Sequence, residues 1–243
     1  MTSVGFLYDS ADLHVGLGGL YDRLLFFPAV LAHNLARRRS IIYIDGFNLY
    51  YGVLKGGPNK WLDLDRFCRM IRKDDDIQRI CYFTARVAGP DRVKQETYLR
   101  AIQTTPLVEL ILGRFKSKTL RCGVQSCTNR GQRLFRSPEE KETDVNIALH
   151  MLDDAYQDRA DLFVLVSGDS DLVPAISYVK TRFPLKQVIA YAPTRSRIRG
   201  AATQIRTMAD KARTLPLAPL SKAQFPVTLP NGQGGTITKP AGW

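Results

Sequence analysis

The stretch VLVSGDSDLVP, residues 164–174, places two carboxylates two residues apart at the end of an apolar run. Asp169 and Asp171 carry like charges that repel each other, and packing does not require them there. A second apolar run, IIYID, ends in Asp45. Both runs have the length and the β-branched composition of buried strands. Because the carboxyl ends of parallel strands meet at one edge of a sheet, we expect these three aspartates to lie close together.

A fourth carboxylate, Asp144, stands early in a predicted helix, beside Glu142. If that helix begins at the same edge, four carboxylates converge. Unpaired carboxylates in a cluster repel one another, and their pKa values rise unless a cation neutralises them. Oxygen ligands without His or Cys suit Mg²⁺ or Mn²⁺, and such an ion activates water for phosphodiester hydrolysis. We therefore assign metal binding and catalysis to Asp45, Asp144, Asp169 and Asp171, and leave the participation of Glu142 open.

Each of these residues also has a purely structural interpretation. Asp45 precedes a glycine and could belong to a turn. Asp169 and Asp171 could cap the following helix, and Asp144 could simply favour a helix dipole. Since all four are predicted at one edge, we favour function over these separate explanations. Asn48, three residues after Asp45, could orient that carboxylate, contact a substrate phosphate or form an ordinary Asx turn.

The elements that position these residues alternate between strand and helix. Amphipathic patterns predict helices at 61–73, 91–103, 140–156, 171–183 and 198–211. Apolar runs predict strands at 41–45, 79–87, 108–115, 162–167 and 187–192. This alternation predicts an α/β fold with a mainly parallel central sheet and helices on both faces.

The helix predicted at 140–156 has the strongest pattern of the chain. The stretch SPEE, residues 137–140, matches a capping box with proline at the first helical position. Residues at helical spacing predict a buried stripe of Val145, Ala148, Met151, Leu152 and Ala155.

Length and charge bound the organisation of the chain. It has 243 residues, a hydrophobic fraction of 44% and a net charge of +12. These values favour one α/β domain with tails and affinity for polyanions, nucleic acid first. We divide the chain into a poorly ordered N-terminal extension (1–39), the domain (40–212) and a proline-rich C-terminal tail (213–243).

The sequence favours a cytoplasmic protein that does not bind a membrane. The longest apolar stretch, residues 24–32, is too short to span a bilayer, and the residues before it lack the positive charge of a signal peptide. Four cysteines are too few for a disulfide scaffold in a chain of this length. Cys122 and Cys127 have a CxxxxC spacing, but a structural zinc site needs four ligands. We expect a pair of thiols or a labile disulfide there.

Basic residues gather in residues 114–136, which we predict to form a hairpin or a long loop. This segment contains no acid, and a second basic loop follows the last strand. Lys and Arg supply most of the sequence-independent affinity for a phosphate backbone, and Tyr50, Tyr51 and Phe135 could stack on unpaired bases. As substrate-binding residues we assign Asn48, Arg114, Lys116, Lys118, Arg121, Arg133, Arg195 and Arg197.

Three motifs together resemble the NYN domains, a branch of the PIN-like metal-dependent ribonucleases. They are YIDGFNLYYG (43–52), EEKETDVNIALHML (139–152) and LVSGDSDLVPAI (165–176), and the resemblance covers residues 40–212. It implies a PIN-like three-layer α/β/α sandwich, with the family's acids at Asp45, Asp144, Asp169 and Asp171. It also implies cleavage of RNA that depends on Mg²⁺ or Mn²⁺.

We therefore expect a metal-dependent ribonuclease whose partner is RNA, and we leave a homo-oligomer open. The alternative is a non-catalytic RNA-binding or regulatory module on the same fold, against which the intact set of acids argues. A phosphatase of the haloacid dehalogenase type also has Asp after its first strand. That chemistry needs a second Asp two residues later, where this chain has Phe47.

Overall fold

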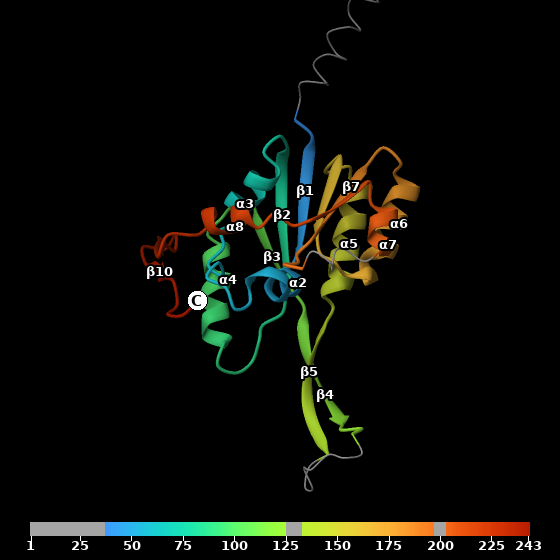
Figure 1. Cartoon of the computed structure of the whole chain (residues 1–243). Coiled ribbons are helices and arrows are strands. Elements are labelled where there is room, and N and C mark those ends of the chain that lie inside the picture. The colour runs from blue at the N-terminus through green and yellow to red at the C-terminus, as the bar shows by residue number, and fades with distance from the viewer. Residues whose placement is uncertain (1–36, 125–132, 197–202) are drawn as a thin grey trace, which may run out of the picture. The chain divides into compact units, whose positions relative to one another are not determined.

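Six parallel strands form the central sheet, in the spatial order β3-β2-β1-β6-β7-β8 (Figure 1). The computed structural model describes residues 37–124, 133–196 and 203–243. All neighbouring strands of the sheet run parallel. The strands are β1 (Arg39–Asp45), β2 (Asp76–Thr84), β3 (Val108–Leu112), β6 (Leu162–Val166), β7 (Gln187–Ala192) and β8 (Lys211–Thr214).

The two central strands, β1 and β6, are apolar along nearly their whole length because both faces of the sheet are covered. Every residue of β6 is buried, as is every residue of β1 except the first. Their side chains alternate between two hydrophobic cores: Ile42 and Ile44 face one core, whereas Ile41 and Tyr43 face the other. The fold is a three-layer α/β/α sandwich, which confirms the predicted class.

Helices supply the two outer layers. One face of the sheet packs against α3 (Leu64–Ile71), α4 (Arg92–Ile102) and α8 (Ala218–Lys222). The opposite face packs against α5 (Thr143–Tyr156), α6 (Val173–Arg182) and α7 (Thr203–Met208). Within the described ranges, no helix is long and apolar enough to cross a membrane.

The order of the strands reverses between β1 and β6. From β1 the sheet extends through β2 to β3, and from β6 it extends the other way through β7 to β8. β1 continues into a short helix, α2 (Gly46–Leu49), and a π-helical turn, η1 (Tyr50–Leu54), while β6 continues into a 3₁₀ turn, η2 (Ser170–Leu172). Open α/β sheets bind ligands beyond the carboxyl ends of strands at such a reversal. Asp45 and Asp169 follow the two strands that define it.

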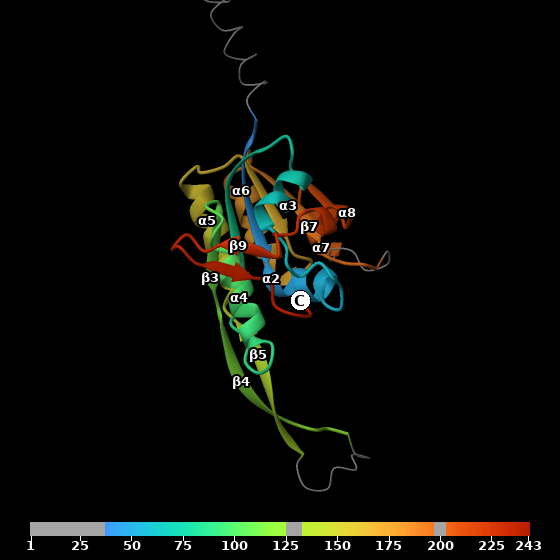
Figure 2. The same cartoon turned by 90° about the vertical axis from the view of Figure 1, so that its left-hand side faces the viewer.

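A long antiparallel hairpin of β4 (Arg114–Arg121) and β5 (Leu134–Lys141) projects from the domain on the side of α2 (Figures 1 and 2). A hairpin is one of the two forms predicted for residues 114–136, and its second strand extends beyond that range to Lys141. The predicted strand 108–115 is divided at Gly113, where an added Cβ would lie 2.6 Å from the carbonyl oxygen of Lys141. That close approach places the root of the hairpin against β3.

The start of α5 differs from the prediction. Residues 137–141 pair with β4 and belong to β5, so SPEE is not a capping box. The helix begins at Thr143, after Glu142 turns the chain with a φ of 79°. Val145, predicted to be buried, is 61% exposed, while Ile147 and Asp154 are buried. Met151 and Ala155 of the predicted stripe are buried, but the rest of the buried face was missed because Thr143 and Asp154 are polar, which an apolar pattern does not reveal.

The C-terminal residues pack on the face of the sheet that α3 and α4 cover. After α8, the strands β9 (Thr228–Pro230) and β10 (Thr236–Thr238) form a small antiparallel pair. Leu220, Leu229 and Ile237 enter the core, and Trp61 Nε1 donates to the carbonyl oxygen of Pro226 at 2.8 Å. Residues 1–36, which make up most of the predicted extension, lie outside the described residues.

Candidate active site

Asp45 is a buried carboxylate held by two hydrogen bonds. Only 5% of its surface is exposed, because it ends a central strand. Its Oδ1 accepts from Asn48 N at 2.9 Å and its Oδ2 from Ser167 Oγ at 3.1 Å. Burial raises the pKa of Asp45, the two hydrogen bonds lower it, and the charges of Glu140 and Asp169 raise it further. A carboxylate in this state attracts a cation.

Asn48 and Ser167 join the loops that follow β1 and β6. Asn48 Oδ1 accepts from Gly168 N at 3.1 Å, and Ser167 Oγ accepts from Asp169 N at 3.1 Å. Together with the bonds to Asp45, these contacts fix the two strand ends against each other. The backbone of Asn48 therefore holds Asp45, and its side chain holds the second loop.

Asp169 follows β6 and caps η2. Its Oδ1 accepts from Asp171 N at 3.0 Å, so of the two aspartates that could cap the following helix, Asp169 is the one that caps it. Asp171 is exposed in the first turn. Its carboxylate is the outermost of the predicted acids.

Asp144 faces the same group of acids from the first turn of α5. Burial raises the pKa of this half-buried carboxyl to about 6, and repulsion from neighbouring acids contributes. In decreasing order of effect these neighbours are Asp45, Asp169, Glu140 and Asp171. The four predicted acids thus belong to one electrostatic cluster beyond the carboxyl ends of β1 and β6.

Glu140 is a fifth member that the sequence did not single out. It lies near the end of β5, raises the pKa values of two clustered aspartates and accepts a hydrogen bond from Thr143 Oγ1. Glu142, the acid left open, instead pairs with Arg114 at 2.6 Å on the surface. Because residues 137–140 were interpreted as a helix cap, Glu140 was not predicted to lie with the other acids. Only the extension of the hairpin to Lys141 brings Glu140 to the cluster.

We call Asp45, Glu140, Asp144, Asp169 and Asp171 the acid cluster. Among the described residues, no Lys, Arg or His lies within ion-pair distance of any of them. No three His, Cys, Asp or Glu side chains of that part of the chain are grouped closely enough to hold a metal ion by themselves. Mg²⁺, however, keeps several waters and takes one or two carboxylates from the protein. The donor types therefore fit such an ion without a closed cage.

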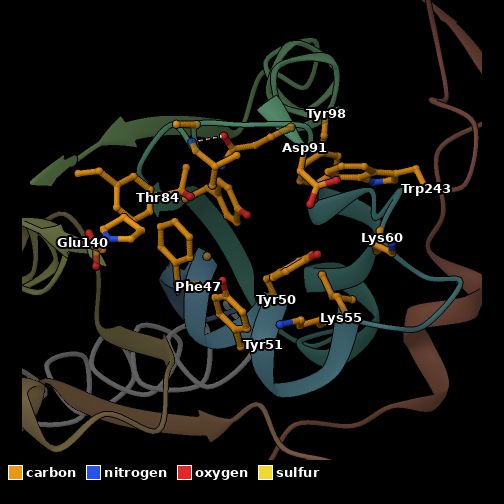
Figure 3. A pocket seen from close by; sticks show the side chains of 18 of the residues that line it. Phe47, Tyr50, Tyr51, Lys55, Lys60, Thr84, Asp91, Tyr98, Glu140 and Trp243 are labelled. Atoms are coloured by element: carbon orange, nitrogen blue, oxygen red, sulfur yellow. Dashed lines mark hydrogen bonds between the residues drawn. The ribbon is translucent and has the colours of Figure 1, made fainter. Parts of the chain in front are cut away.

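Two cavities flank the acid cluster. One, of about 600 Å³, is lined by residues that include Asn48, Gly168 and Asp169. The other, of about 590 Å³, has Glu140 in its wall, and we call it the aromatic cavity (Figure 3). Phe47 and Tyr51 line both. The rings that line the aromatic cavity are those of Phe47, Tyr50, Tyr51, Tyr82, Tyr98, Phe115 and Trp243.

The basic residues assigned to substrate binding differ in their surroundings. Lys116, Lys118 and Arg121 are exposed along β4, which leaves them available to a polyanion. Arg114 neutralises Glu142 at the root of the hairpin. Arg133 is exposed and directly precedes β5, at the end of the hairpin that is farthest from its root.

Arg195 has a structural contact instead. Its guanidinium donates two hydrogen bonds to the carbonyl oxygen of Val53, at 2.6 and 3.1 Å, and so ties the loop after β7 to η1. Arg197 and Cys127 lie outside the described residues, and Cys122 is a half-exposed free thiol. Phe135, a candidate for stacking, lies opposite Leu120 in the hairpin and is 51% exposed.

Similarities to known proteins cover most of the chain. The family model described as "NYN domain" matches residues 39–215. The chain is also 30% identical over 237 residues to 6-hydroxy-3-succinoylpyridine 3-monooxygenase HspA of Pseudomonas putida, a match that covers 84% of this chain and 75% of that protein.

Two solved structures are more distant. A protein of unknown function from Vibrio parahaemolyticus matches with a TM-score of 0.46 and 18% identity, over 73% of this chain and 92% of that chain. A nicotinamidase from Staphylococcus aureus matches with a TM-score of 0.28 and 12% identity, over 67% of this chain and 86% of that chain.

Proposed function

Because the chain belongs to the NYN domain family, we propose that it is a divalent-metal-dependent ribonuclease, a hydrolase of RNA phosphodiester bonds. The observation that carries this proposal is the acid cluster without a basic partner, placed where the strand order reverses. A net charge of +12 and the exposed cations of the hairpin support a polyanionic substrate.

The residues of the acid cluster would contribute differently to binding of the metal ion. Asp45 and Asp169 are the best-fixed ligands, since hydrogen bonds orient both carboxylates. Asp144 and Glu140 approach from α5 and β5, and the exposed Asp171 would contact the ion through water. A bound Mg²⁺ or Mn²⁺ supplies an acidified water and neutralises charge on the attacked phosphate. Ser167 and Asn48 keep the ligands in position.

The test is cleavage of a single-stranded RNA by the purified protein with Mn²⁺ or Mg²⁺, against the same reaction in excess chelator. We expect Asp169→Asn to lower the rate at least about 100-fold, because it removes the charge of a metal ligand. Asparagine keeps the oxygen that caps η2, so the fold is retained. Asp74→Asn, an exposed acid outside the cluster, is the matched control and should cleave normally.

Cleavage that survives in Asp169→Asn would refute the assignment of the site. Binding of RNA without cleavage under any metal would instead favour the non-catalytic RNA-binding module.

The hairpin should contribute general affinity for RNA rather than selectivity. A triple variant, Lys116→Ala, Lys118→Ala and Arg121→Ala, removes three phosphate contacts. The slope of log K against log salt should then become shallower by about 2, at about 0.7 per contact on a single strand. Fluorescence anisotropy over a salt series measures this slope. A control variant removes exposed cations elsewhere, at Lys73, Arg100 and Lys222, and an equal effect there would contradict a role for the hairpin.

A monooxygenase is the second candidate. The Pseudomonas putida relative is named for the oxygenation of a hydroxylated pyridine, and the aromatic cavity is large enough for such a ring. The reaction would place one atom of O₂ on the ring and release the other as water, with two electrons from a reduced nicotinamide. Oxidation of NADH that depends on a hydroxypyridine, with no metal-dependent cleavage of RNA, would favour this candidate.

A further inference from the structure

We infer that the aromatic cavity binds one unpaired base of a single-stranded RNA and thereby positions the neighbouring phosphodiester at the acid cluster. This inference rests on the proposed ribonuclease function and adds a substrate subsite to it.

The rings of the cavity are held in place by one another and remain accessible. Phe47 stacks on Tyr51, with ring centroids 6.2 Å apart and planes at 20°, and meets Phe115 edge to face at 5.5 Å. Tyr51 is nevertheless 61% exposed. A large ring that is both fixed and exposed suits stacking on a nucleobase, because little side-chain freedom is lost on binding. Phe115 comes from β4, so the basic hairpin and the cavity share a wall.

Two lysines in the wall indicate a ligand with negative charge. Lys55 Nζ lies 4.7 Å from the centre of the Tyr51 ring, and Lys60 Nζ lies 5.7 Å from that of Trp243. Neither lysine forms an ion pair with a described residue, whereas Asp91, an acid of the same wall, is paired with Lys94 at 3.9 Å. Ammonium groups of this kind are available to phosphate. Rings together with unpaired cations fit a nucleotide better than a neutral apolar molecule.

The layout of the cavity gives the bound strand a direction. In Figure 3, Glu140 lies at one end, Lys60, Asp91 and Trp243 lie at the other, and Phe47, Tyr50 and Tyr51 lie between them. Glu140 belongs to the acid cluster and Gly46 of the cavity wall directly follows Asp45. A base on the rings therefore has one adjoining phosphate near the acids and the next near Lys60, while Lys55 lies beside the Tyr51 ring. The volume of about 590 Å³ accommodates a nucleotide.

A base pocket also restricts the substrate. A base can enter only after it leaves its pair and its stack, so single-stranded RNA or an unpaired loop is the substrate and a continuous duplex is not. Because every base has a ring face, stacking alone tolerates all four bases.

The experiment compares two ligands with equal charge on the full-length Asp169→Asn protein, which leaves RNA intact. One is a uridine decamer, and the other is a decamer of abasic ribose phosphates. We expect the uridine decamer to bind roughly 5- to 150-fold more tightly, the range for one stacked base. A second substitution, Tyr51→Leu, should remove most of this preference, whereas Tyr51→Phe should keep it.

Tyr178→Leu is the matched control, since Tyr178 is an exposed tyrosine on α6, on the opposite face of the sheet. It should retain the full preference. Equal binding of the two decamers, or a preference that survives Tyr51→Leu, would overturn the base pocket. Displacement of the uridine decamer by a hydroxypyridine carboxylate at concentrations where uridine monophosphate has no effect would also overturn it, in favour of a small heterocycle.

The two proposals fail separately. A wild-type protein that cleaves no RNA with any metal, but whose Asp169→Asn variant shows the ring-dependent preference, has the base pocket and lacks the ribonuclease function. A protein that cleaves RNA and binds both decamers equally has the function and lacks the pocket.

Discussion

Asp45→Asn removes the cleavage of RNA without unfolding the protein. The rate should fall at least about 100-fold, because the substitution takes the charge from the central ligand of the acid cluster. Asparagine has nearly the same shape and still accepts from Asn48 N, and the Ser167 hydroxyl can turn to accept from its amide. Cleavage of a fluorescently labelled single-stranded RNA in Mn²⁺ measures the loss.

The stability of the same variant separates a functional carboxylate from a structural one. In chelator, Asp45→Asn should be at least as stable as the wild type, since it removes a buried charge that burial and neighbouring acids disfavour. In Mn²⁺ at about 100 times its dissociation constant, the wild type should gain about 2.7 kcal/mol, or roughly 5 to 10 °C in Tm. The variant should gain much less.

Thermal melts with and without Mn²⁺ check both statements, and Asp74→Asn serves as the control. A destabilised variant with an unchanged response to Mn²⁺ would show that Asp45 is a structural residue.

Local signals in the sequence predicted the centre of the site. Asp45 ends a run of buried residues and Asp169 follows another by two residues, and a buried parallel strand leaves the residues at its C-terminal end at the sheet edge whatever the rest of the chain does. Asp144 was predicted to lie early in a helix, and it does lie in the first turn of α5, although that helix begins later than predicted. The reversal of strand order between β1 and β6 then brings these residues together.

The features that sequence analysis did not predict depend on contacts between residues far apart in the chain. Glu140 reaches the acid cluster only because β5 continues to Lys141, and pairing with β4 sets that length. The aromatic cavity combines α2, η1, the hairpin and Trp243 from the end of the chain. Arg195 looks like any other basic loop residue until its bonds to Val53 are seen. None of these relations has a spacing that can be recognised along the sequence.

Asp154 is the structural counterpart of Asp45. It is fully buried on α5, and an apolar pattern gives no sign of it. It accepts from Tyr43 Oη at 2.7 Å, from Arg79 Nη2 at 2.6 Å and from Arg159 Nη1 at 2.8 Å. Both guanidinium groups neutralise it, whereas Asp45 has no basic partner. Burial, followed by the charge of Asp154, raises the pKa of Tyr43 well above its usual value, so this hydroxyl stays protonated as a donor.

Asp154→Ala should therefore destabilise the protein by about 3 kcal/mol, because it leaves the buried Tyr43 hydroxyl without an acceptor and leaves Arg79 with Glu109 as its remaining partner. Urea unfolding in chelator measures this loss. Asp153→Ala, the exposed neighbour that also pairs with Arg159, is the matched control and should change stability much less, because solvent screens its ion pair. Equal losses for the two variants would refute the buried network. Since Asp45→Asn is expected to be at least as stable as the wild type in chelator, the pair of variants tests whether cationic partners distinguish the structural aspartate from the functional one.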